Sequence, residues 1–156
     1  MTCRWPILAV FLMGGCAELM PVAPPQSTPV QTTVAEVPVA RPPVQTARTV
    51  DQFDTTTAAD RATVITAAQT AQAEVALGRT IASLGDPTDP GFWLKTPLVE
   101  DVRPGRIAYP ANGKTVVVEL RPLDAPNTAG SQISLPAMRV IEAPLTGLPE
   151  IEVFGR

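Results

Sequence analysis

Residues 114–120 read Lys-Thr-Val-Val-Val-Glu-Leu, the strongest strand signal in the chain. β-branched residues favour strands, and Val116 and Val118 fall two positions apart, so one face of this strand is apolar. Asn112-Gly113, just before it, is typical of a turn, and residues 106–109 predict a short partner strand joined to it by a longish loop. The stretch therefore predicts a β-hairpin at the centre of a C-terminal β domain.

The same domain, residues 86–156, contains further short strand signals. Residues 92–99, interrupted by Pro97, and residues 131–135 predict strands, and residues 150–154 alternate polar and apolar side chains. Pro136 favours the first turn of a short helix that runs to residue 142. Several short strands with one short helix predict an α+β fold with a small β-barrel-like domain.

Residues 51–85 predict one long helix that precedes this domain. Thr57-Ala58-Ala59-Asp60 is a capping box with Asp in place of the usual Glu, and the stretch up to residue 84 is rich in alanine. Gly85 provides a helix stop, whereas Gly78 inside the pattern predicts a close packing contact or a kink. We expect the helix to pack on the C-terminal domain; a partner helix is the alternative.

The N-terminus has the features of an export signal. Arg4 precedes an apolar run of nine residues, 5–13, which is too short to cross a bilayer because a spanning helix needs roughly 20 residues. Residues 13–16, Met-Gly-Gly-Cys, resemble the lipobox of bacterial lipoproteins. The resemblance implies that residues 1–15 are a cleaved signal peptide and that Cys16 carries acyl chains such as palmitate. A plain signal cleaved after Ala17 is the alternative.

Residues 16–50 predict the lipid anchor and an extended tether. Residues 17–50 contain seven prolines, which remove backbone donors and stop helix or sheet from propagating. A polyproline-II-rich tether of this length reaches ~100 Å and would act as a spacer. Ala17 follows the cysteine, where the lipoprotein family has Asp for inner-membrane retention, so the resemblance implies the periplasmic face of the outer membrane.

Composition excludes some functions. The formal net charge is −3, and no basic stripe is present, so we expect no nucleic-acid partner. The chain has no histidine, and its two cysteines, Cys3 and Cys16, both lie at the N-terminus. The most common general base and zinc ligand is therefore absent, and we expect no metal site and no cofactor.

The C-terminal sequence resembles rare lipoprotein A over about 45 residues. The segments that carry the resemblance are residues 113–120, 124–126, 130–135 and 150–153. The resemblance implies a double-psi β-barrel and either cleavage or binding of peptidoglycan. Ser134 stands where that family has Asp at the strand-to-helix junction, Ala125 replaces the Arg-Gly of its acidic turn, and its upstream histidine has no counterpart, with Asp86 lying nearest. The resemblance therefore implies the fold more strongly than the activity.

A second resemblance concerns the Ser-Leu-Gly-Asp-Pro segment and the Gly-Phe-Trp-Leu strand within residues 83–94. The chain is similar here to short Gram-negative lipoproteins labelled "D-galactarate dehydratase". That label implies a sugar-acid dehydratase, an activity that normally uses a metal. The lack of histidine argues against it, although carboxylates alone can bind hard cations.

Three residues are candidates for a functional site. Asp124 would be a catalytic acid if an apolar wall raised its pKa, but it is otherwise a turn cap before Pro126. Trp93 would offer a platform for a sugar ring, unless it is buried like its neighbour Phe92. Arg121 would bind wall carboxylates, unless it is an ordinary surface charge.

These observations favour a non-catalytic protein that binds peptidoglycan or another envelope protein. Its membrane partner would be the bilayer, reached through the lipid on Cys16. A peptidoglycan-cleaving enzyme and a sugar-acid dehydratase are the alternatives.

Overall fold

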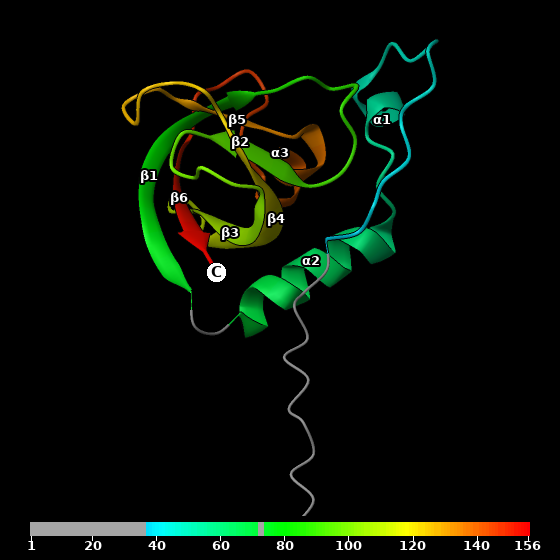
Figure 1. Ribbon diagram of the computed structural model, residues 1–156. Helices are drawn as coiled ribbons and strands as arrows, with labels where there is room; N and C mark the ends of the chain where they lie inside the picture. The colour runs from blue at the N-terminus through cyan, green and yellow to red at the C-terminus, as the bar shows by residue number, and fades with distance from the viewer. Residues whose placement is uncertain (1–36, 72–73) are drawn as a thin grey trace, which may run out of the picture. The chain divides into compact units, whose positions relative to one another are not determined.

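The computed structural model describes residues 37–71 and 74–156. Its elements are α1 (Val50–Phe53), α2 (Ala58–Thr70), β1 (Val75–Leu84), β2 (Trp93–Thr96), β3 (Arg103–Tyr109), β4 (Lys114–Pro122), β5 (Ser131–Ile133), α3 (Leu135–Val140) and β6 (Glu150–Gly155) (Figure 1). The predicted signal peptide, Cys16 and most of the predicted tether lie outside the described residues. Of the helices in the described ranges, none combines the length and hydrophobicity needed to cross a membrane.

Six strands close into a barrel in the order β1, β5, β2, β4, β3, β6 (Figure 1). The β1–β5 and β2–β4 pairs are parallel, and the other four neighbouring pairs are antiparallel. The predicted hairpin joins β3 and β4, with Tyr109 opposite Lys114 across the Asn112-Gly113 turn. The prediction of an α+β fold with a small barrel is confirmed.

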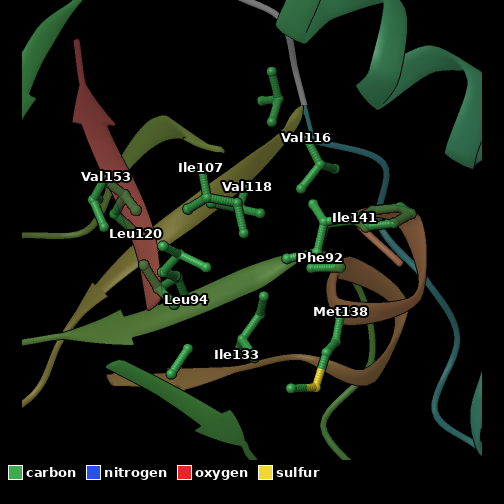
Figure 2. Packing of buried hydrophobic residues seen from close by; sticks show 14 of the residues in the cluster. Phe92, Leu94, Ile107, Val116, Val118, Leu120, Ile133, Met138, Ile141 and Val153 are labelled. Carbon is green, nitrogen blue, oxygen red and sulfur yellow. The ribbon is translucent and has the colours of Figure 1, made fainter. Parts of the chain in front are cut away.

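The barrel interior is filled by apolar side chains that alternate along the strands. On β4, Val116, Val118 and Leu120 are fully buried, and Ile107 of β3 lies opposite Val116. Figure 2 shows these side chains converging with Leu94 and residues from β5, β6 and α3. The apolar face predicted at period two is therefore the face that lines the barrel.

Helix α2 covers the outside of the barrel. It begins as predicted, because Thr57 Oγ1 accepts from Asp60 N–H and the Asp60 side chain accepts from the Thr57 N–H, which is a complete capping box. The helix buries Val64 and Ala68 and packs on β4. Val117 points to the opposite side of β4 from Val116 and is also buried, so β4 is apolar on both faces at this point. The predicted packing of the helix on the C-terminal domain is confirmed for α2.

The single helix predicted for residues 51–85 is wrong in its second half. Helix α2 ends at Thr70, and residues Val75–Leu84 form β1, the longest strand of the barrel. Gly78 has φ of +138°, which no helical residue adopts, and the register with β6 shifts there, forming a bulge. Alanine content is a weak guide to secondary structure, and here the closure of the barrel between β5 and β6 overrides it.

The predicted tether, residues 16–50, reaches too far along the chain. Val37 packs against the apolar core cluster, and Ala47 is buried. Thr55 Oγ1 donates to the carbonyl of Arg41 at 2.5 Å. Residues 37–50 therefore lie on the barrel domain instead of forming part of a free spacer.

Two element boundaries also differ from prediction. β2 ends at Thr96, before Pro97, whereas the predicted strand ran to residue 99. α3 begins at Leu135 with Ser134 as its N-cap, so Pro136 lies inside the first turn, where its missing N–H is tolerated.

Candidate functional site

A cluster of charged side chains lies on the outer face of β2 and β4. These strands are parallel neighbours, with Trp93 beside Glu119 and Lys95 beside Arg121. Because side chains alternate across a strand, all four side chains share one face. Asp89, from the loop between β1 and β2, reaches the same place. We call Asp89, Trp93, Lys95, Glu119 and Arg121 the β2–β4 cluster.

Arg121 is the centre of the β2–β4 cluster. Its Nε donates to Glu119 Oε1 at 2.5 Å, and its Nη1 donates to Asp89 Oδ2 at 2.9 Å. Lys95 Nζ also donates to Asp89 Oδ2, at 3.3 Å. Burial alone would lower the pKa of Arg121, but the hydrogen bonds to Glu119 and Asp89 outweigh it and raise the pKa above its ordinary value. Arg121 therefore stays charged at every physiological pH.

Trp93 lies beneath these charges. Its side chain is fully buried, and its indole N–H donates to the Asp89 carbonyl at 3.1 Å. Lys95 Nζ lies 4.6 Å from the ring centroid and Arg121 Cζ lies 5.4 Å from it, so both cations contact the ring. Trp93 and Phe92 are both buried, so Trp93 is the floor of the β2–β4 cluster and not an exposed platform for a sugar ring.

The ion pairs of the β2–β4 cluster add little to stability. The charged side chains are between 27% and 41% exposed. Ion pairs at such partly exposed sites contribute about 0 to 1 kcal/mol each. Solvent reaches the cluster, so its charges are available to a ligand.

A hollow of about 270 Å³ lies beside the cluster. Asp89, Glu119 and Arg121 of the cluster line it, together with Pro90 and residues 91–92. Residues 37–40 line it as well, so the N-terminal segment contributes to the site.

The other predicted site residues lie elsewhere. Asp124 is exposed in the connection between β4 and β5. Ser134 is fully buried, and its hydroxyl accepts from the N–H groups of Trp93 at 3.1 Å and Ala137 at 3.4 Å. Asp86 is exposed, and hydrogen bonds from Thr88 lower its pKa. The structure thus brings Trp93 and Arg121 together and leaves Asp124 in an exposed turn.

Sequence analysis missed Asp89, Lys95 and Glu119. Lys95 and Glu119 each lie two positions from a predicted site residue, so the period of a strand would have pointed to them. Asp89 lies in a loop and gave no such signal.

Within the described ranges, no group of three or more Asp, Glu, His or Cys side chains is arranged so that it could hold a metal ion. Comparisons with protein-family models, with curated proteins and with solved structures found no match to this chain.

Proposed function

We propose that the chain is a lipoprotein anchored in the outer membrane through Cys16, and that its barrel domain binds peptidoglycan or another envelope component without cleaving it. The lipobox-like residues 13–16 and the proline-rich residues that follow support the anchor and the periplasmic location. Two lipid chains or more give stable attachment, which a single acyl chain does not.

The observation that carries the non-catalytic part concerns Ser134. The resemblance to rare lipoprotein A implies an acidic residue at this strand-to-helix junction. Here the Ser134 hydroxyl is fully buried, caps α3 through Ala137 N–H and holds the backbone of Trp93. A buried hydroxyl occupied in this way supplies no acid to a bound ligand. The two parallel strand pairs inside a closed six-stranded barrel are compatible with the double-psi topology that the resemblance implies.

The binding surface that we propose is the β2–β4 cluster with its hollow. It offers several charged hydrogen-bonding groups beside a concave surface, and these groups contribute little to the stability of the barrel. Ligand sites combine such a hollow with a few polar groups.

The test is a pelleting assay with the full chain in detergent and purified peptidoglycan sacculi. We expect the chain to pellet with the sacculi and to release no soluble fragments. Arg121→Ala should reduce pelleting, whereas the matched control Arg79→Ala should not, because Arg79 pairs with Glu150 and Glu152 on the β1–β6 side of the barrel. Release of fragments would show catalysis, and pelleting unaffected by Arg121→Ala would rule out the β2–β4 cluster as the binding surface.

The anchor is tested separately with Cys16→Ser. This change should abolish acylation and leave the protein out of the membrane fraction or as an uncut precursor. Normal processing and membrane retention of this variant would contradict the proposed anchor.

A further inference from the structure

The charges of the β2–β4 cluster cancel. Lys95 and Arg121 carry positive charges, and Asp89 and Glu119 carry negative charges, all within one hydrogen-bonded and ion-paired group. A surface of zero net charge does not concentrate simple anions or simple cations, because it lacks a field of one sign. A ligand that carries a positive and a negative charge on neighbouring groups matches this surface better.

The cluster retains hydrogen-bonding capacity on the three side chains that line the hollow. A guanidinium has five N–H donors and a carboxylate has two acceptor oxygens. Among the described residues, Arg121 Nη2, Glu119 Oε2 and Asp89 Oδ1 receive or make no hydrogen bond within this cluster, whose contacts use the other atoms of these groups. The three side chains that line the hollow thus keep two acceptor atoms and one donor atom that the contacts within the cluster leave unused.

The rest of the wall of the hollow is apolar. Val37, Pro38, Val39 and Ala40 line it, and Pro90 adds to it from the loop before β2. A ligand that fills the hollow would therefore place an aliphatic stem along this wall and its charged end on the β2–β4 cluster.

We propose that the hollow binds the zwitterionic end of an α-amino acid, with its ammonium on Glu119 or Asp89, its carboxylate on Arg121 and its aliphatic stem along residues 37–40. This inference rests on the proposed function. It selects the peptide part of peptidoglycan, where a diamino acid with a free end carries such a group, over the glycan part.

The test uses the full chain in detergent and three small probes that differ only in their charged groups. Diaminopimelic acid carries both groups, pimelic acid carries the carboxylates alone, and cadaverine carries the ammonium groups alone. The chain has two tryptophans, Trp5 and Trp93, and Trp5 lies in the predicted signal peptide. In the proposed mature form, which begins at Cys16, Trp93 is therefore the sole tryptophan reporter beneath the cluster. We expect diaminopimelic acid to change the Trp93 emission and to bind at least about tenfold more tightly than either other probe.

Two variants assign the binding to the cluster. Glu119→Gln keeps the shape but removes one of the two carboxylate charges that attract the ammonium, and Arg121→Lys keeps the charge but loses the planar fork that suits a carboxylate. Each should weaken diaminopimelic acid binding about tenfold or more, and Arg79→Ala should leave it unchanged. Far-UV circular dichroism of each variant verifies that the barrel is intact.

The outcomes separate this inference from the proposed function. Equal binding of the three probes, or binding of an N-acetylglucosamine oligomer in place of diaminopimelic acid, would overturn the zwitterion site while sacculi still pellet the chain. Failure of sacculi to pellet the chain would overturn the proposed function, whatever the small probes do.

Discussion

Gly105 on β3 is the position where one added methyl group should damage the barrel most. It lies opposite Gly155 of β6, across one of the seams that close the barrel. A Cβ at Gly105 would lie 2.5 Å from the Phe154 carbonyl oxygen and 2.5 Å from Leu120 Cδ1, about 0.9 Å short of the 3.4 Å at which ordinary contact begins. The carbonyl belongs to the backbone of the neighbouring strand, so it cannot rotate away as a side-chain end could.

The change Gly105→Ala must therefore push β3 and β6 apart or force the Leu120 side chain out of its place. Overpacking of this kind costs typically 1 to 3 kcal/mol, and backbone involvement places this case near 3 kcal/mol. For a domain of this size, that free energy lowers Tm by roughly 12 to 24 °C.

The assay is thermal unfolding of the full chain, followed by far-UV circular dichroism. Gly113→Ala is the control, because a Cβ there meets nothing within 4 Å and only the left-handed φ of +71° is strained. The control should lose about 1 kcal/mol. A Tm for Gly105→Ala no lower than that of Gly113→Ala would refute the reasoning from the close strand contact.

Three further changes test other parts of the structure. Gly85→Ala places a Cβ against Trp93 Cη2, closer than any ordinary contact, and should displace the indole, which a shift in Trp93 emission would reveal. Unchanged emission would contradict this packing. Thr57→Ala removes the helix cap and should cost about 1 kcal/mol in denaturant unfolding. The backbone and side-chain hydrogen bonds from Thr57 lower the pKa of Asp60 below 3.8. The stability that these bonds contribute is therefore present at neutral pH and is lost as the pH falls through the lowered pKa. If acid unfolded Thr57→Ala and the unchanged protein at the same pH, this link between the cap and acid stability would be wrong. Asp54→Ala removes the buried carboxylate that accepts a hydrogen bond from Arg139 Nη1 at 2.9 Å. The change should lower the free energy of unfolding by about 2 kcal/mol and expose residues 37–57 to proteases. Normal protease resistance of this variant would disprove the reasoning.

Local signals in the sequence predicted the elements that depend on local interactions. The Thr57–Asp60 capping box needs only four consecutive residues, and the structure has both of its hydrogen bonds. The Asn112-Gly113 turn likewise depends on the conformation of its own residues and on the two strands that it joins. Such elements can be predicted because their partners are close in sequence.

β1 could not be predicted in this way, because its partners are distant in sequence. It pairs with β6 through Val75–Gly155 and with β5 through Ala82–Ser131, so its conformation is decided by strands more than 45 residues away. Its own residues include only two that are buried, Thr80 and Ala82, so no long apolar alternation marks it as a strand, and it follows an alanine-rich stretch that favours a helix. Non-local pairing therefore outweighs local propensity in this strand.

The candidate site shows the same division between local and non-local information. Trp93 and Arg121 each attracted attention from their chemistry, but nothing in the sequence placed them side by side. Their proximity depends on the parallel pairing of β2 with β4, and these two strands are separated along the chain by β3. Once that register is known, the two-residue period of a strand places Lys95 and Glu119 on the same face. Asp89 alone requires the loop structure itself, because it is held by Trp93 Nε1 on its carbonyl and by Arg121 on its carboxylate. Four of the five residues of the cluster are therefore brought together by one strand pairing, so a change that disturbs the β2–β4 register should remove the proposed binding even when each charged residue is still present.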